Sequence, residues 1–278
     1  MKHGANKLRS VFTQRHLSIG NLRMWVREAG VAEGVPLLLL HGLVVSGEAW
    51  VQAAQLLSKG YRVIVPDLPG SGRSDKPDTG YAVEKLANQV LGLIDALDLS
   101  QVVVVGHSFG GHVALAFALA HPERARSLVL VDAFGLGADI CLDALEPLLQ
   151  ESNENNVRAF VSAMVYRRDR IPESLVLTTI RELSAPAAHS ALYVLARSAN
   201  GPEGQRGMLK ERLGELQPRT LIIWGEHDNI LPRHQGYEAA LLPPEARFVV
   251  IPGCGHCPHI EQPSAVMRII CAFLDGQE

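Results

Sequence analysis

The 278-residue sequence has few cysteines, no long apolar run and no large excess of either charge. Four cysteines are too few for a scaffold held together by disulfides. No stretch approaches the roughly 18 apolar residues of a transmembrane helix, and no signal-peptide core follows the basic residues 1–9. We therefore expect a cytoplasmic protein with no membrane span. A net charge of −3 without a stripe of Lys and Arg argues against a nucleic-acid partner.

Short apolar stretches alternate with helical patterns along most of the chain. A Gly20-Asn21 pair between two alternating stretches predicts a hairpin near the start. Apolar residues at helical spacing predict an amphipathic helix over residues 83–97. Buried strands are predicted at residues 36–41, 61–66, 102–105, 127–132, 220–224 and 247–251. Strand–helix alternation of this kind predicts an α/β fold, with a mostly parallel sheet covered by helices on both faces.

The alternation stops in the middle of the chain. Residues 134–204 show helical patterns and no good strand, and they end at the breaker Asn200-Gly201-Pro202. We therefore predict three parts: residues 11–133 as the first part of an α/β core, 134–204 as a helical cap, and 205–278 as the second part of the core. A single domain that carries an insertion fits this chain length.

The most informative motif is Gly106-His107-Ser108-Phe109-Gly110, which follows four valines and opens a helical pattern. Glycine on both sides of Ser108 permits a sharp turn, because a Cβ there would collide with nearby backbone. Such a strand–turn–helix context is typical of a nucleophile elbow, in which the serine hydroxyl is exposed above the sheet. Ser108 is therefore the candidate nucleophile.

A serine hydroxyl needs a base, and the base needs an acid that orients it. Asp228 lies a few residues beyond the predicted strand at 220–224, where catalytic groups collect in open α/β sheets. It is the predicted acid. Two rivals remain open: Glu226 is two residues away, and Asp132 ends the strand at 127–132.

His256 follows the last predicted strand on a Gly-rich loop and is the predicted base, with His259 as its nearest competitor. Cys254 and Cys257 flank His256 and invite a zinc interpretation. A structural zinc needs four ligands, and no second Cys or His pair at suitable spacing is present. We predict no metal and no organic cofactor, and we interpret these cysteines as packing residues.

The negative charge that develops on a substrate oxygen needs two backbone donors. We predict the N–H of Phe109, directly after the nucleophile, and the N–H of Leu43 in the loop after the strand at 36–41. Gly42 would let that loop approach the substrate. His41, at the strand end, is expected to support the loop by hydrogen bonding.

These blocks together resemble the α/β-hydrolase superfamily. The resemblance rests on His41-Gly42 with Ser46 and Trp50, and on residues 67–74, 106–111, 225–228 and 255–256. It implies an eight-stranded, mostly parallel sheet with a cap between strands six and seven. It also implies a catalytic triad of Ser108, Asp228 and His256, which is the chain order found in that family.

The resemblance leaves the substrate open. We predict a serine hydrolase that cleaves small-molecule carboxylic esters, as an esterase or lipase does. One alternative is a C–C bond hydrolase of aromatic-ring cleavage products, although Leu43-Val44-Val45 and His107 depart from the Gly-rich and Asn-containing patterns of those enzymes. Another is a ligand receptor with slow or no turnover.

Two interpretations remain open for the arginines of the predicted cap. Arg167, Arg168 and Arg170 could bind a substrate carboxylate or lie at a solvated helix end. We expect a monomer or a homodimer.

Overall fold

Eight strands form one sheet in the computed structural model, which describes residues 12–243 and 245–276. Their order across the sheet is β1-β2-β4-β3-β5-β6-β9-β10. Strand β2 pairs antiparallel with β1 and β4, whereas the other neighbours pair in parallel. The mostly parallel sheet is therefore confirmed. The strands are β1 (Thr13–Ile19), β2 (Leu22–Gly30), β3 (Pro36–Leu40), β4 (Arg62–Pro66), β5 (Val102–His107), β6 (Ala125–Val131), β9 (Arg219–Gly225) and β10 (Arg247–Ile251).

The first two strands form the predicted hairpin. Ile19 pairs with Leu22, so Gly20 and Asn21 are the two turn residues. Gly20 adopts a φ of 56°, which glycine tolerates and which suits the tight turn of a two-residue hairpin loop.

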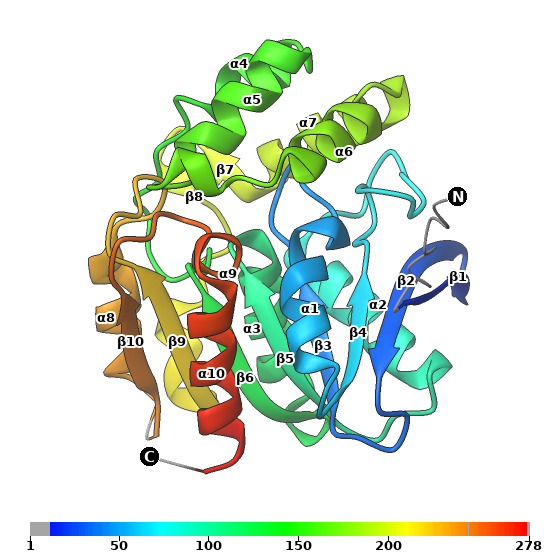
Figure 1. Cartoon of the computed structure of the whole chain (residues 1–278), viewed down its shortest axis with the longest axis vertical. Helices are drawn as coiled ribbons and strands as arrows, with labels where there is room; N and C mark the ends of the chain where they lie inside the picture. The colour runs from blue at the N-terminus through cyan, green and yellow to red at the C-terminus, as the bar shows by residue number, and fades with distance from the viewer. Residues whose placement is uncertain (1–11, 244, 277–278) are drawn as a thin grey trace, which may run out of the picture.

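Helices cover both faces of the sheet, because side chains of the inner strands alternate between two apolar clusters. Leu38 and Leu40 of β3 belong to one cluster, with α2 (Val83–Ala96), α3 (Phe109–Ala120) and α8 (Arg233–Ala240). Leu37 and Leu39 belong to the other, with α1 (Val51–Leu57) and α10 (Pro263–Leu274). Figure 1 shows α1 and α10 together on the near face. None of the described helices is long and apolar enough to cross a membrane.

Four helices between β6 and β9 form a separate layer at one end of the sheet (Figure 1). They lie within residues 134–204, where helical patterns were predicted, and we call them the cap. They are α4 (Leu145–Gln150), α5 (Glu154–Ala163), α6 (Glu173–Leu183) and α7 (Pro186–Ala199). Their apolar sides form a third cluster, which also includes Val44 and Val45 of the loop after β3.

The prediction that residues 134–204 contain no strand is wrong. Strands β7 (Asn200–Gly201) and β8 (Gly204–Gln205) pair antiparallel, so the predicted breaker supplies β7 itself and, with Pro202, the first residue of the turn. Two-residue strands are too short to show an alternating pattern. The division at 133/134 and 204/205 stays a prediction, and its outer limits, residues 11 and 277–278, lie outside the described chain.

Short helical segments complete the described chain. A 3-10 helix, η1 (Gly47–Trp50), precedes α1, and the side chain of Ser46 caps it by accepting a hydrogen bond from the N–H of Glu48. The others are η2 (Pro122–Arg124), η3 (Arg168–Arg170), η4 (Lys210–Glu215) and the single turn α9 (Pro258–Glu261).

Candidate active site

Ser108 occupies a strained turn between β5 and α3. Its φ of 51° and ψ of −120° form a conformation that L-residues rarely adopt. Its N–H donates to the carbonyl of Val131 at 3.0 Å, and its own carbonyl accepts from the N–H of Phe134 at 3.0 Å. The turn is therefore held by the end of β6. Among the described residues, the Ser108 hydroxyl has no hydrogen-bond partner.

Glycines at positions 106 and 110 make this turn possible. A Cβ on Gly106 would lie 2.3 Å from the carbonyl oxygen of Gly110. A Cβ on Gly110 would lie 2.4 Å from the carbonyl oxygen of His41. Both contacts are with backbone, which cannot move aside cheaply. The steric reason proposed from the sequence therefore holds in the structure.

Asp228 and His256 form a buried pair. Asp228 Oδ2 lies 2.8 Å from His256 Nδ1, and the two side chains are 0% and 2% exposed. Asp228 Oδ1 accepts hydrogen bonds from the N–H groups of Ile230 at 2.8 Å and Leu231 at 3.0 Å. An ionised carboxylate only accepts, so Nδ1 carries the hydrogen of this bond. In the neutral imidazole, Nε2 is then the atom with the free lone pair.

Neither rival acid bonds to His256. Glu226 accepts from the N–H of Gly253 at 3.0 Å, and its side chain is 40% exposed. Asp132 is fully buried nearby, and its Oδ1 accepts from the N–H of Gly225 at 2.8 Å. The structure thus pairs His256 with the acid that the sequence favoured.

Three further histidines lie buried around His256. His41 donates from Nδ1 to the carbonyl of Gly42, and its Nε2 accepts from the N–H of Leu68 at 2.8 Å, which is the supporting role expected for it. His107 donates from Nε2 to the carbonyl of His256 at 2.8 Å. Burial lowers the pKa of both rings.

The competitor His259 stacks between Trp50 and His107, with ring centroids 4.2 Å and 4.4 Å away. Burial, then the charge of His256, lowers its pKa to about 3. Of these four histidines, only His256 bonds a carboxylate.

Two backbone amides next to Ser108 remain available as donors. Leu43 follows Gly42, whose added Cβ would lie 3.1 Å from Ser108 Cβ, so this loop runs directly against the serine. Phe109 opens α3, and first-turn N–H groups have no acceptor within their own helix. Among the described residues, neither the Leu43 nor the Phe109 N–H donates to a neighbour. Both lie where the sequence predicted oxyanion donors.

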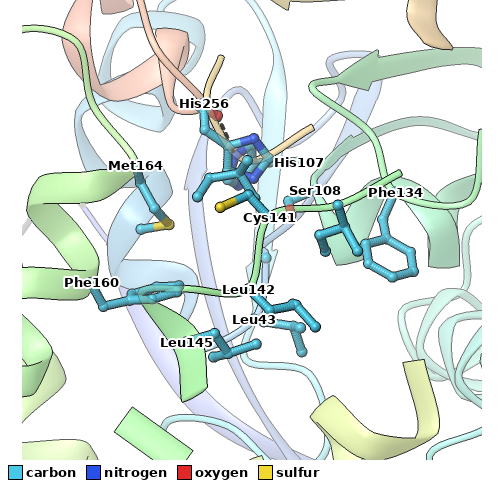
Figure 2. A pocket seen from close by; sticks show the side chains of 13 residues that line it. Leu43, His107, Ser108, Phe134, Cys141, Leu142, Leu145, Phe160, Met164 and His256 are labelled. Atoms are coloured by element: carbon cyan, nitrogen blue, oxygen red, sulfur yellow. Dashed lines mark hydrogen bonds between the residues drawn. The ribbon is translucent and has the colours of Figure 1, made fainter. Parts of the chain in front are cut away.

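Ser108 and His256 open into one cavity of about 460 Å³ between the core and the cap (Figure 2). Apolar side chains form most of its wall, and Phe160, Leu142 and Leu145 lie together on the side facing the polar residues. None of its described lining residues is Lys, Arg, Asp or Glu. They are Gly42, Leu43, His107, Ser108, Phe134, Ile140, Cys141, Leu142, Leu145, Phe160, Met164, Ile230 and His256.

The cysteines near His256 are buried and free. Burial raises the pKa of Cys254 to about 12 and that of Cys257 well above its usual range. A cysteine binds zinc as a thiolate, a form that this environment disfavours. In the described part of the chain, the one group whose donor atoms could meet at a metal is Asp132, Asp228 and His256, without either cysteine.

The arginines of the cap lie outside the cavity lining. Arg167 pairs with Asp169 at 2.8 Å, and both side chains are about half exposed or more. Arg170 donates to the carbonyl of Glu261 at 3.2 Å. Arg168 is exposed. The solvated interpretation of Arg167, Arg168 and Arg170 therefore fits the structure better than a role in holding a substrate carboxylate.

Sequence reasoning gave no role to Glu261, a buried carboxylate on α9. Its Oε1 accepts from the N–H of Gly255 at 2.6 Å, directly before His256. Its Oε2 accepts from the N–H of Arg167 in the cap at 2.8 Å. Glu261 thus ties the histidine loop to the cap. A single glutamate in the short stretch between Pro258 and Pro263 carries no sequence signal of burial.

Comparisons with known proteins identify the family to which this fold belongs. A protein-family model described as "Alpha/beta hydrolase family" matches residues 37–269. The chain is 30% identical to a 2-hydroxy-6-oxononadienedioate/2-hydroxy-6-oxononatrienedioate hydrolase of Cupriavidus pinatubonensis, over 85% of this chain and 86% of that protein.

Two solved structures are also similar. One is a meta-cleavage product hydrolase from Pseudomonas fluorescens, with 26% identity and a TM-score of 0.84 over 95% of this chain and 98% of that one. The other is a bacterial membrane phospholipase A, with 27% identity and a TM-score of 0.84 over 96% and 87%. By its fold, its matched segment and its relatives, the chain belongs to the alpha/beta hydrolase family.

Proposed function

We propose that this hydrolase cleaves carboxylic esters with a small or medium apolar acyl group, through an acyl-enzyme on Ser108. His256 Nε2 takes the hydroxyl proton as Ser108 Oγ attacks the acyl carbon. Asp228 keeps the hydrogen on Nδ1 and stabilises the imidazolium that forms. The hydrogen bond between Ser108 and His256 forms when substrate binds, since such contacts tighten in the complex.

The remaining steps use groups already adjacent to Ser108. The N–H groups of Leu43 and Phe109 receive the oxyanion of the tetrahedral intermediate, assisted by the N-terminus of α3. His256 then gives its proton to the leaving alcohol. A water molecule, deprotonated by His256, attacks the acyl-enzyme and releases the acid. No metal or organic cofactor enters these steps.

The apolar wall of the cavity supports an ester in preference to an anionic substrate. The Cupriavidus relative is named for a dienedioate, which carries two carboxylates. A carboxylate taken out of water needs a cation or several donors nearby. Here the described cavity wall offers no Lys or Arg side chain. An uncharged acyl chain fits such a wall better.

A C–C bond hydrolase is the second candidate, because two of the similar proteins are named for that chemistry. The two functions separate in a side-by-side assay of p-nitrophenyl esters from acetate to decanoate and of a vinylogous 1,5-diketone with and without a terminal carboxylate. We expect measurable kcat/KM for the shorter esters and none for the carboxylate-bearing diketone. The opposite ranking would overturn the ester proposal.

A fluorophosphonate probe tests the nucleophile and distinguishes an enzyme from a receptor. We expect labelling of the folded protein, and loss of both labelling and ester turnover in Ser108→Ala. Ser184→Ala, at an exposed position in the cap, is the matched control and should label normally. Failure to label Ser108 in folded protein would favour a ligand receptor. Retained turnover in Ser108→Ala would remove Ser108 from the mechanism.

A further inference from the structure

Asp132 is a buried carboxyl that none of the proposed steps uses. It follows β6 directly, adopts a φ of 44°, and is 0% exposed. Its N–H donates to the carbonyl of Ile223 in β9 at 2.9 Å. A non-glycine residue in this left-handed conformation costs free energy and persists only where its surroundings hold it. The strained backbone, the burial and the hydrogen bond to β9 together hold the Asp132 side chain in one place.

The carboxyl of Asp132 reaches the pair formed by Asp228 and His256. One oxygen of each aspartate and one ring nitrogen of His256 all lie within 4.8 Å of one another. Asp132 Oδ1 accepts from the N–H of Gly225, whereas Oδ2 is buried and, among the described residues, meets no donor. An ionised Oδ2 would therefore be buried without compensation, next to a second carboxylate.

A proton explains this cluster better than a cation. Both oxygens of Asp228 already have partners, Oδ1 in two backbone N–H groups and Oδ2 in His256. Two carboxylates sharing a buried site cannot both remain charged, so one takes up a proton. Asp228 has the donors that stabilise a negative charge, and Asp132 has only one. The proton therefore belongs on Asp132.

We infer that Asp132 carries a proton on Oδ2 and donates it in a hydrogen bond to Asp228, acting on His256 through that carboxylate. This inference rests on the proposed function, because it assigns Asp132 as a positioning residue for the base. The other charged groups around it favour the same protonation. Burial, then the charge of Asp228, raises the pKa of Asp132 well above its usual range, and Glu261 on α9 adds to the effect. The N–H of Gly225 acts in the opposite direction.

The consequence is a carboxylate that accepts from four donors. Ile230, Leu231, His256 and Asp132 together fix the position and spread the charge of Asp228. A single negative charge then faces the imidazole, instead of two. Burial of the thiol also raises the pKa of Cys257 beside this cluster, so that thiol remains uncharged.

Two substitutions separate the hydrogen bond from the charge. In Asp132→Asn, the amide oxygen can still accept from Gly225 and the amide N–H₂ can still donate to Asp228, with no charge. In Asp132→Leu, the donor is lost at similar volume. We expect Asp132→Asn to keep kcat and the acid limb of the pH–rate profile. We expect Asp132→Leu to lower kcat about 10-fold with little change in KM, since a donor to a charged group is lost.

Two results would contradict a protonated Asp132 that donates to Asp228. If Asp132 were ionised, Asp132→Asn would remove a negative charge near His256 and move the acid limb to lower pH. That shift would overturn the inference, as would a kcat for Asp132→Leu equal to that of the parent protein. An unchanged acid limb in Asp132→Asn together with a lower kcat in Asp132→Leu supports it.

A measurement without substrate keeps this inference separate from the proposed function. The spectra are taken in a Glu182→Gln background, because Glu182 also has a raised pKa, of about 7, and would add its own band at neutral pH. Difference infrared spectra of the free proteins should then show a protonated-carboxyl C=O band that disappears in Asp132→Asn. Asp139→Asn, at an exposed position in the loop after β6, is the matched control and should leave the band intact. A band that Asp132→Asn does not remove overturns the inference. If that band is present and no ester is cleaved, only the proposed function fails.

Discussion

Glu182 on α6 makes a contact between the cap and the core that should depend on pH. Its Oε1 accepts a hydrogen bond from Ser46 Oγ at 3.1 Å, beside the loop after β3. Burial, then the charge of Asp67, raises the pKa of Glu182 to about 7 from an ordinary value of 4.5. The hydrogen bond from Ser46 and the charge of Arg27 act against this rise, and Glu48 adds to it. Protonated Glu182 is thus the form that this buried position favours.

The sign of the effect follows from proton binding. Between pH 4.5 and about 7, the folded protein keeps a proton on Glu182 that the unfolded chain has lost. Stability from this group is therefore fully present below pH 4.5 and is lost as the pH rises to about 7. Since a tenfold change in a proton equilibrium is worth about 1.4 kcal/mol, the loss amounts to roughly 3 kcal/mol of unfolding free energy.

Glu182→Gln should remove this pH dependence, because the amide oxygen still accepts from Ser46 and never ionises. Urea unfolding at a series of pH values gives the free energy of each protein. Near pH ~4 the two proteins should agree, and near pH ~8 the Gln variant should be more stable by up to about 3 kcal/mol. Glu151→Gln, exposed at the end of α4, is the control and should follow the parent protein. Parallel curves for Glu182→Gln and the parent would refute the reasoning.

Three further substitutions test the site and its support. Phe160→Ala should enlarge the cavity, move the ester-length optimum in kcat/KM toward longer acyl chains, and lower the unfolding free energy by about 3 kcal/mol; an unchanged optimum would place the acyl chain elsewhere. Glu261→Gln replaces one of two acceptors, so the N–H of Gly255 or of Arg167 loses its partner, and urea unfolding should report a loss of about 2 kcal/mol. Gly110→Ala puts a Cβ 2.4 Å from a main-chain oxygen and should cost about 3 kcal/mol or more; near-normal stability would show that the elbow can relax.

Where local sequence dictates local geometry, the predictions from sequence match the structure. The four valines before Gly106 are β-branched and buried, and they form β5 as predicted. Glycine is required on both sides of Ser108, because an added Cβ would lie 2.3 Å or 2.4 Å from a backbone oxygen. One of these oxygens belongs to the same turn and the other to the end of the neighbouring strand. The positions of Asp228 and His256 follow from strand ends, because the carboxyl ends of parallel strands meet at one edge.

Features that depend on contacts between distant segments could not be predicted. Of the cavity wall, Leu145 and Phe160 come from the cap helices α4 and α5, and Leu142 comes from the segment before α4. Only the docking of the cap on the core brings these side chains to Ser108. Their sequence pattern is that of any amphipathic helix, so it does not show which apolar residue packs inside the cap and which faces a substrate. The pairing of β7 with β8 cannot be predicted either, because a strand of two residues is too short to show an alternating pattern.

The ionisation of buried carboxyls is the hardest property to predict, and three acids here show why. Asp132, Glu182 and Glu261 are ordinary acidic residues in the sequence, but each is wholly or largely buried by segments far along the chain. Glu261 has two backbone N–H donors, one for each carboxyl oxygen. Glu182 receives one hydroxyl donor and lies near a negative charge, so its proton is held to about pH 7. Asp132 has one donor, and burial and then a carboxylate neighbour raise its pKa well above the usual range. The donors and charges around each acid come from distant segments, so they are set only when those segments pack together.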